Sequence, residues 1–385
     1  MTLDRKLTLG AYVVFVVAIF AVPLFVDEFG LNRIAKFLVY GMLGVAIALS
    51  WGYAGILNLG QGLFFGLGGY MLAMSLKLAS PTSLQQGADK PVPDFMLWNA
   101  EPGALTDLCC INKASFLWLP FQHLGFGIVL GIVVPVVVAA LLGIIVFRKR
   151  IEGPFVSIIT LALVLLVRLV LVDAQPVTGG FNGLTDLASL EIFGFEFDPY
   201  GKATYWLVAT ILTLTLVGAR LLVETRAGLV LQAARDDQRR VRYLGFDVSL
   251  YQTFFFAVTA AIAGLAGMLY VVVAQFASPT FMDLAFSVTM VVWAAVGGRA
   301  SILGACIGAI LINVMEAGIS ETEALVGAWK AIIGLVFVLT VLFLPRGLGG
   351  LVHDLIGRLA AARLAPRRTA QALPTSASVT EAKEA

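Results

Sequence analysis

The residues of this sequence that can act as acids, bases, nucleophiles or metal ligands are not spaced as in any recognisable site. The two histidines, His123 and His353, lie far apart and without the HExxH spacing of zinc hydrolases. Cys109 and Cys110 are adjacent in a polar loop and Cys306 lies in an apolar segment, which is neither a disulfide framework nor a metal-ligand spacing. The sequence also lacks the GxxxxGKS or GxxxxGKT pattern that cradles ATP phosphates. We therefore expect no enzyme active site, metal site or ATP site in this chain.

Composition decides the broad class of protein. Of 385 residues, 59% are hydrophobic and 13% are charged, and the mean hydropathy is +0.94. Soluble domains carry about twice that charged share, roughly a quarter of all residues. The sequence therefore predicts an all-α polytopic membrane protein. Its net charge of +2 is too small to indicate a nucleic-acid partner.

Apolar segments separated by polar ones predict about ten membrane-spanning helices. The first is expected to be retained as a span, because it lacks the small-residue cleavage site of a secretory signal. A short polar turn is predicted at 27–36, and the break between the second and third spans at 57–62. The predicted spans are 7–26, two within 37–79, 124–147, 154–172, 203–223, 251–275, 284–296, 302–317 and 326–344.

These spans form one predicted transmembrane domain, 1–350, followed by a cytoplasmic tail, 351–385. The spans on either side of Gly297 and Gly298 are short, so a re-entrant pair is the alternative there. A long polar loop at 80–122 is predicted on the periplasmic side. The last stretch of the tail, about 20 residues rich in Ala, Ser, Thr and charge, is predicted to be disordered.

Basic residues predict the orientation of the domain, because cytoplasmic segments of membrane proteins are enriched in Lys and Arg. With the N-terminus inside, the cytoplasmic segments hold the basic clusters at 148–150 and 226–242. The outer loops then hold only scattered basic residues. Both termini are therefore predicted to be cytoplasmic.

The stretch 226–247 is the one long polar interruption in the apolar second half of the chain. It carries five arginines and three aspartates, and Gly228 and Gly245 bracket a run of good helix formers. We expect a short surface helix whose apolar stripe faces the membrane domain and whose basic face meets the cytoplasm. The stripe is Val230, Ala234, Asp237, Val241 and Leu244, and the basic face is Gln232, Arg235, Arg239 and Arg242. Composition alone leaves open a solvated loop helix with no partner.

Two glycine-rich joints, 57–71 and 294–309, are the other unusual feature. Small residues at this spacing let helices approach closely. They also permit broken helices whose backbone groups line a polar path. The predicted translocation-path residues are Asn58, Gln61 and Asn313, and a helix-to-helix hydrogen bond is the alternative for Asn313. Arg168 lies inside a predicted span, where a snorkelling or structurally paired arginine is favoured over a pore residue.

Four motifs give the chain a resemblance to a known family. They are NLGQGLFFGLGGYM (58–71), GPFVSIITLALVLLVRLVLVDAQPVTGGFNGL (153–184), AGLVLQAARDDQRRVRYLGFDVSLYQTFFFAVTAAIAGLAGMLY (227–270) and LFLPRGLGG (342–350). Through them the chain resembles the permease subunits of ABC importers for branched-chain amino acids and their relatives, over nearly all of 37–350. Within that family, SWGYAGILNLGQG, TGGFNGLTD and VWAAVGGRASILGACIGA resemble the urea importer's permease more than the amino-acid one.

The resemblance implies partners that composition does not show. Such permeases lie in the bacterial inner membrane, pair with a second, homologous permease and receive solute from a periplasmic binding protein. They also bind two cytoplasmic ATPase subunits, which hold the ATP and Mg, so no cofactor is expected in this chain. The stretch 226–247 then resembles the coupling helix that docks on an ATPase. The implied coupling residues are Gly228, Ala233, Ala234, Arg235, Asp236, Arg239 and Gly245.

The sequence thus predicts a permease subunit of an ATP-driven importer that carries urea or a short-chain amide. Branched-chain amino acids are the alternative solutes. An ion-coupled carrier or a channel is the alternative from another class. It is disfavoured because the predicted spans lack an array of carboxylates, the usual mark of ion coupling.

Overall fold

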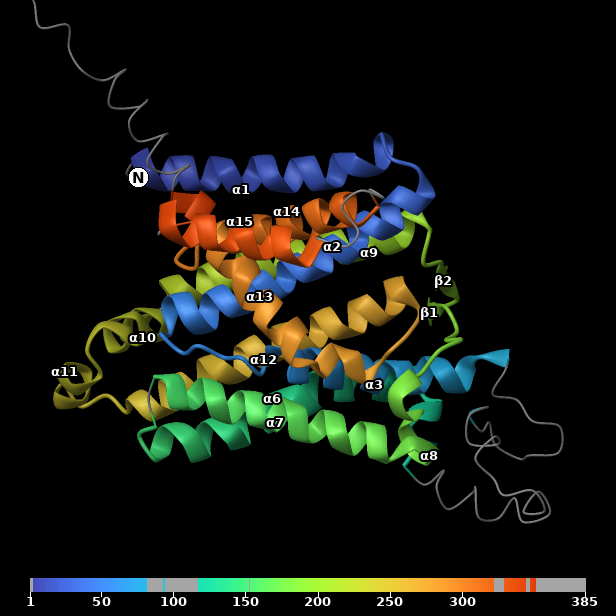
Figure 1. Cartoon of the computed structure of the whole chain (residues 1–385), viewed down its shortest axis with the longest axis horizontal. Helices are drawn as coiled ribbons and strands as arrows, with labels where there is room; N and C mark the ends of the chain where they lie inside the picture. The colour runs from blue at the N-terminus through green and yellow to red at the C-terminus, as the bar shows by residue number, and fades with distance from the viewer. Residues whose placement is uncertain are drawn as a thin grey trace, which may run out of the picture.

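The computed structural model describes residues 3–81, 93, 117–151, 153–321, 329–343 and 347–350. In these ranges the chain is mostly helical, and ten of its helices follow the predicted spans in order (Figure 1). They are α1 Leu3–Ala21, α2 Glu28–Ile47, α3 Gln61–Ala79, α6 Leu124–Arg148, α7 Pro154–Asp173, α9 Lys202–Glu224, α12 Val248–Ala274, α13 Leu284–Gly297, α14 Ile302–Ser320 and α15 Trp329–Phe343. The predicted tail and most of the predicted loop at 80–122 lie outside the described residues.

Seven of the described helical segments are long and apolar enough to cross a membrane. They are Glu28–Tyr53, Gln61–Ala79, Leu124–Arg148, Pro154–Asp173, Lys202–Glu224, Val248–Ala274 and Ile302–Ser320. The apolar segment Thr8–Leu24, which runs from α1 into the 3-10 turn Val22–Leu24, and α13 are shorter, and α15 has 15 residues. The predicted count of ten spans therefore stays a prediction, and so does the re-entrant alternative for α13 and α14.

The predicted polar turn at 27–36 is wrong, because α2 already begins at Glu28. Its polar residues are helical because other elements satisfy them. Asn32 is buried and its Nδ2 donates to the carbonyl oxygens of Pro199 and Val273, both at 2.8 Å. Arg33 Nη1 lies 2.7 Å from Glu321 Oε1, next to the end of α14. Tertiary partners thus let a polar sequence extend the helix by more than two turns.

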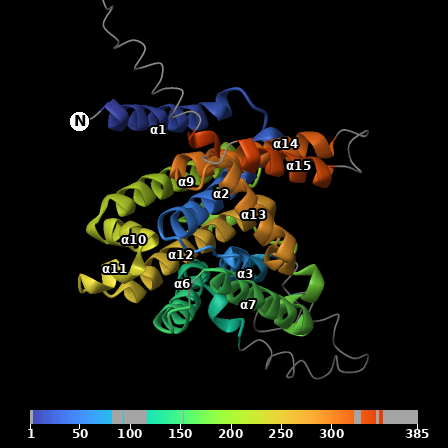
Figure 2. The ribbon, with the colours of Figure 1, turned by 60° about the vertical axis from the view of Figure 1, so that its left-hand side comes forward.

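Three helices form the centre of the bundle. In the most apolar stretch of each helix, 83% of the residues are buried in α3 and 72% in α2 and in α12. The share is only 22% in α6 and in α7. α12 packs against α2, α3 and α6, and α2 packs against α9 and α14. α1 lies at the outer side of the bundle in two views (Figures 1 and 2). The helices that expose most apolar surface therefore surround those that expose least.

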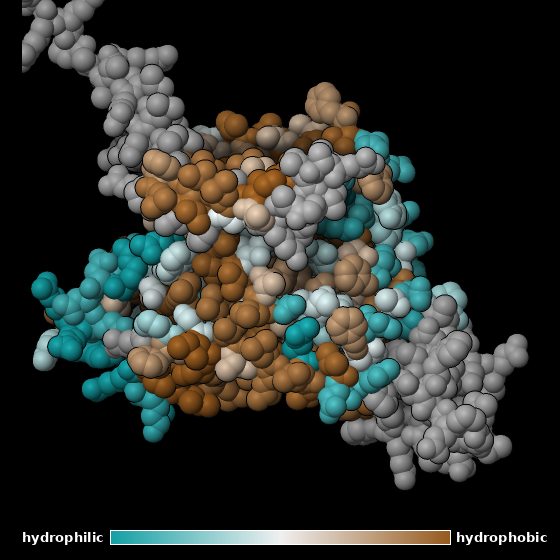
Figure 3. All heavy atoms as spheres, viewed as in Figure 1, coloured by the Kyte–Doolittle hydropathy of each residue, from teal (hydrophilic) through white to brown (hydrophobic). Residues whose placement is uncertain are grey.

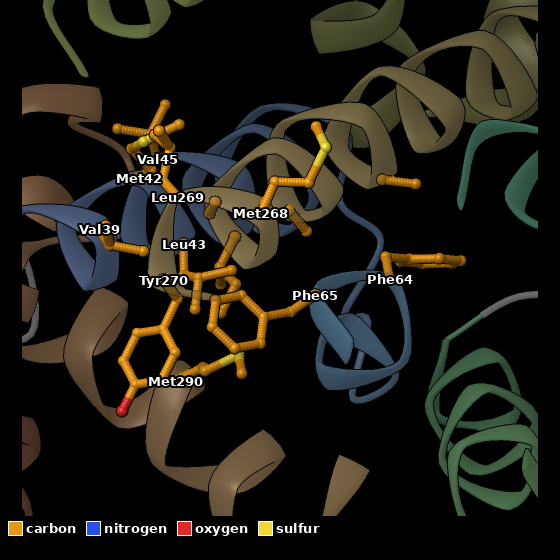
Figure 4. Close-up of a cluster of buried hydrophobic side chains, with 14 of the residues drawn as sticks. Val39, Met42, Leu43, Val45, Phe64, Phe65, Met268, Leu269, Tyr270 and Met290 are labelled. Carbon is orange, nitrogen blue, oxygen red and sulfur yellow. The ribbon is translucent and has the colours of Figure 1, made fainter. Parts of the chain in front are cut away.

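Aromatic and aliphatic side chains from α2, α3, α12 and α13 meet in the interior (Figure 4). The rings of Phe65 and Tyr270 lie with their centroids 5.5 Å apart in an edge-to-face arrangement, and Phe65 also meets Phe281 at 5.4 Å. Such pairs contribute about 0.5–1.5 kcal/mol beyond the area that they bury. They join the long helices to the short α13 region.

Glycines bring the backbones of the central helices into contact. A Cβ atom at Gly267 of α12 would lie 1.9 Å from the carbonyl oxygen of Phe65 in α3, and one at Gly68 would lie 2.2 Å from the carbonyl oxygen of Gly264. No side chain fits at these distances. The glycine-rich motif is therefore required for helix packing, as one of the two interpretations of the sequence predicted.

The two ends of the bundle are polar and the band between them is apolar (Figure 3). The start of α1 lies at the same end as the two short helices α10, Arg226–Asp236, and α11, Gln238–Tyr243 (Figure 1). The segment between α7 and α9 lies at the opposite end. This agrees with the predicted alternation of the spans, while the cytoplasmic position of either end remains a prediction.

A short β-hairpin at that opposite end is an exception to the all-α prediction. Strand β1, Leu190–Ile192, pairs antiparallel with β2, Phe195–Phe197. The two turn residues between them, Phe193 and Gly194, both have positive φ, which suits a two-residue hairpin. Leu184 also exchanges two backbone hydrogen bonds with Ala277, at 2.7 and 2.9 Å, so the polar loop is held against the segment before α13.

The close contact at Gly267 generates a first prediction. Gly267→Ala should destabilise the protein by about 1–3 kcal/mol, because the new methyl group overlaps backbone that cannot move aside. Gly218→Ala in α9, where nothing lies within 4 Å of an added Cβ, is the matched control and should be neutral or slightly stabilising. Thermal unfolding of the two purified variants compares them. Equal midpoints would contradict the packing role of Gly267.

Candidate coupling site

The predicted coupling stretch begins at a sharp turn between α9 and α10. The Thr225 hydroxyl accepts a hydrogen bond from the Gly228 amide at 3.2 Å and so caps α10. A Cβ at Gly228 would lie 2.5 Å from the carbonyl oxygens of both Leu222 and Val223. Gln232 Nε2 donates to the Val223 carbonyl at 3.2 Å. Gly228 is therefore needed where α10 folds back against the end of α9.

The single predicted surface helix is wrong, because the structure breaks it at Asp237. This residue has extended backbone, φ −155° and ψ 98°. Its carboxylate accepts hydrogen bonds from the amides of Arg239 at 3.0 Å and Arg240 at 3.2 Å, which caps α11. Aspartate competes well for such capping positions, so it ends one helix and starts the next.

An apolar cluster holds both short helices on the membrane domain. Ala234, Val241 and Val248 are buried together, and Val230 packs against them. The predicted stripe is confirmed for Val230, Ala234 and Val241. It is wrong for Leu244, which is 75% exposed, because the break at Asp237 interrupts the helical periodicity. Three residues of the predicted coupling set, Ala233, Asp236 and Arg239, lie on the exposed side.

Gly245 terminates α11. Its φ of +88° is a left-handed conformation that glycine adopts without strain, and its amide donates to the Arg242 carbonyl at 2.9 Å. This is the helix end that the sequence predicted.

Arg235 contacts the membrane domain although its side chain is 39% exposed, so its predicted orientation toward the cytoplasm stays a prediction. Its Nη1 donates to the Gly52 carbonyl oxygen at 2.6 Å, while Nε and Nη2 donate to Asp236 Oδ1 at 3.2 and 3.1 Å. Gly52 lies in the last turn of a helix, where carbonyl groups lack a partner in their own helix. A guanidinium is well suited to such a helix end because of its charge and its fixed donors.

The segment that Arg235 reaches is a six-residue π-helix, Ala48–Tyr53, which extends α2. Its last three residues contact the turn between α13 and α14. A Cβ at Gly52 would lie 1.7 Å from the Arg299 carbonyl oxygen, Tyr53 Oη donates to the Ala300 carbonyl oxygen at 3.0 Å, and Arg299 Cζ lies 5.0 Å from the centre of the Trp51 ring. Sequence reasoning missed these contacts. The available signal was a glycine between two aromatic residues at the end of an apolar run.

The predicted path residues Asn58 and Gln61 lie together at the joint before α3, and both are buried. Asn58 Nδ2 donates to Gln61 Oε1 at 2.6 Å, and Asn58 Oδ1 accepts from the Gly60 amide at 2.8 Å. Gln61 Nε2 donates to the Thr259 carbonyl at 2.9 Å. In this conformation both amides therefore hold the non-helical joint to α12. Their predicted role on a translocation path stays a prediction.

Among the described residues, no hydrogen bond connects Asn313 to Asn58 or Gln61. Its Nδ2 donates to the Ala309 carbonyl of its own helix at 2.7 Å. Arg168 lies 3.7 Å from the carboxylate of Asp283, the residue that caps α13. Arg168 is therefore a structurally paired arginine, as the sequence favoured.

Over the described residues, no group of His, Cys, Asp and Glu is placed to hold a metal ion. Cys306 is a buried free thiol beside Gly41, whereas Cys109 and Cys110 lie outside the described residues.

Comparison with known proteins places this geometry in a family. Residues 30–341 match the family described as the permease component of the branched-chain amino acid transport system. The chain belongs to this family. Among its relatives are the high-affinity branched-chain amino acid transport system permease proteins LivM of Salmonella typhimurium and of Escherichia coli. Each is 26% identical over 374 residues, which cover 90% of this chain and 75% of the relative.

More distant relatives include a permease that is named for another solute. The ribose import permease protein RbsC of Haemophilus influenzae is 23% identical over 179 residues, which cover 45% of this chain and 54% of the relative. No solved structure matches the chain. Within this permease family, the two short helices of this chain are a polar projection from a multi-pass membrane protein.

The cap at Asp237 generates a second prediction for the permease. Asp237→Ala should destabilise α11 locally by about 1 kcal/mol, because two amides lose their acceptor. Asp237→Asn retains a capping oxygen and is the matched control. Hydrogen exchange of the α11 amides in the purified variants measures the effect. Faster exchange only in the alanine variant is expected, whereas unchanged exchange in both would contradict the capping role.

Proposed function

We propose that this protein is the permease subunit of an ABC importer in a bacterial inner membrane. The observation that carries the proposal is the pair α10 and α11 within a permease-family fold. One side of the pair is fixed to the membrane domain by the Val241 cluster and by Arg235, and the other side is open. A surface that receives movement from a partner has to be fixed on one side and accessible on the other.

The partner that suits this open side is a cytoplasmic ATPase. The chain itself lacks an ATP-binding pattern, so the energy of ATP reaches it through another subunit. Two ATPase subunits, a second homologous permease and a periplasmic binding protein complete the proposed importer. ATP and Mg are then held by the ATPase subunits, and none of the coupling residues of this chain touches them.

The proposed docking surface consists of Arg239, Arg240 and Tyr243 on α11 and of Leu244, which follows its last residue. Tyr243 is 91% exposed and Leu244 75% exposed, beside two exposed arginines. Exposed aromatic and arginine side chains dominate the energy of many protein interfaces. Figure 3 shows the hydrophilic residues that surround this end of the molecule. Asp236 and Ala233 lie on the exposed side of the adjoining α10.

Branched-chain amino acids are the first proposed solutes. The support is the family description and the names of the LivM relatives. Urea or a short-chain amide is the second proposal, which rests on the sequence motifs 50–62, 178–186 and 292–309. The binding protein is expected to set most of the specificity, so solute contacts in the permease leave a weak signal in its sequence.

An ion-coupled carrier is the rival from another class. A carrier driven by protons or sodium needs titratable groups along the path. One charged residue within a predicted span, Arg168, is engaged with Asp283. This pair supports the start of α13 and gives Arg168 a structural role.

Docking on an ATPase generates the third prediction. The double variant Arg239→Glu with Tyr243→Ala should lower co-purification of the ATPase subunits by at least about tenfold, equivalent to about 1.4 kcal/mol, because it removes an aromatic contact and reverses a charge. ATP-dependent uptake should fall with it. Lys202→Glu is the control, since it makes the same charge change at the opposite end of the bundle. Normal co-purification of the double variant would contradict this docking surface.

A further inference from the structure

The π-helical segment Ala48–Tyr53 lies between elements that the proposed mechanism needs to move together. It contacts α10, α12 and α14 and continues the chain of α2. Two hydrogen bonds join it to the residues that follow, Ala54 N to Leu49 O at 3.0 Å and Ile56 N to Ser50 O at 2.7 Å. The end of α2 is thereby bound to the chain that follows it.

One side of this segment is bound to α10. The Gly52 carbonyl oxygen accepts from Arg235 Nη1 at 2.6 Å, and a Cβ at Gly55 would lie 2.8 Å from Arg235 Cγ. Both the charged head and the aliphatic part of Arg235 thus contact the chain after α2. The same guanidinium is bound to the exposed carboxylate of Asp236, so one side chain connects the open side of α10 to the interior contact.

The other side of the segment is bound to the turn between α13 and α14. The close backbone contact of Gly52 with Arg299, the Tyr53 hydrogen bond to Ala300 and the Trp51 contact with Arg299 all meet this turn. A cation over an indole ring contributes about 0.5–2 kcal/mol. Three contacts of different kinds from three consecutive residues fix the segment and the turn to each other.

The turn connects the end of α13 to the start of α14. Helix α13 ends at Gly297 and begins beside Asp283, where Arg168 of α7 is bound. Two of its buried polar atoms, Ser287 Oγ and Trp293 Nε1, have no hydrogen-bond partner within the described protein. A buried group without a partner costs about 1–3 kcal/mol. α13 therefore carries unmet hydrogen-bonding groups in this conformation, as does α3.

We propose that Arg235 and the segment Ala48–Tyr53 transmit movement of α10 to the α13–α14 turn, so that ATPase closure displaces α13. Arg235 is then a positioning residue that acts inside the permease and takes no part in docking. The inference rests on the proposed function, because it assigns the internal route of a movement that begins at the ATPase. It differs from a static brace, which would stabilise the fold without linking ATP hydrolysis to transport.

The test uses the complete importer in proteoliposomes and measures solute moved per ATP hydrolysed. Tyr53→Phe removes only the hydroxyl that binds Ala300, and Arg235→Met removes the donor to Gly52. Each should lower the ratio by at least about fivefold, the smallest effect typical of coupled sites, while the ATPase subunits still co-purify. Arg235→Lys should restore part of the ratio. Tyr200→Phe, an exposed tyrosine at the opposite end, is the matched control and should keep the parent ratio.

The outcomes separate this inference from the proposed function. A parent complex without ATP-dependent uptake would refute the proposed function itself. A normal parent together with a parent-like ratio in both Tyr53→Phe and Arg235→Met would overturn the inference and leave the proposed function intact. Loss of ATPase association in Arg235→Met would also overturn it, because Arg235 would then belong to the docking surface. Reduced protein yield lowers uptake and hydrolysis equally, so the ratio still decides, and Tyr53→Phe alone decides if Arg235→Met does not fold.

Discussion

The backbone contact between α3 and α12 is the constraint on which the rest of the structure depends. In a bilayer, apolar side chains gain little by leaving lipid for protein, so close packing and satisfied backbone groups have to hold the helices together. Glycines at 68, 264 and 267 allow this packing. Because α3 lies so close to α12, the non-helical joint before α3 falls beside Thr259, where the amides of Asn58 and Gln61 satisfy it. A buried break in a helix is thereby tolerated, and α2 can end in its π-helical turn.

That ending connects the membrane core to the proposed ATPase surface. A helix end leaves carbonyl groups without partners, and the Gly52 carbonyl obtains one from Arg235 of α10. The outer residues of α10 and α11 are exposed, whereas the inner ones belong to the apolar cluster around Val241. The short helices are thus attached to the domain at two kinds of contact, one apolar and one charged. A movement of their exposed side would reach the membrane domain through these two contacts.

Much of this fold was predictable from hydropathy and from glycine. The order of the apolar helices, the end of α11 at Gly245 and the inward stripe of Val230, Ala234 and Val241 follow from periodicity and backbone conformation. The failures have a common cause, which is tertiary partners that a local pattern does not contain. Residues 28–36 are helical because Asn32 and Arg33 find distant partners, and the hydrogen bond from Arg235 to the distant Gly52 carbonyl is equally absent from the local pattern. Two other features were readable but missed: the capping strength of Asp237, and the alternation of LEIFGFEF around the hairpin turn.

The most direct test of the account is ATP-driven accumulation by the reconstituted importer. Proteoliposomes with this permease, its second permease, both ATPase subunits and the binding protein would receive labelled leucine or labelled urea, with ATP or ADP. The account predicts that labelled leucine accumulates against its gradient only when ATP and the ATPase subunits are both present. Uptake at an unchanged rate without ATP or without the ATPase subunits would contradict it.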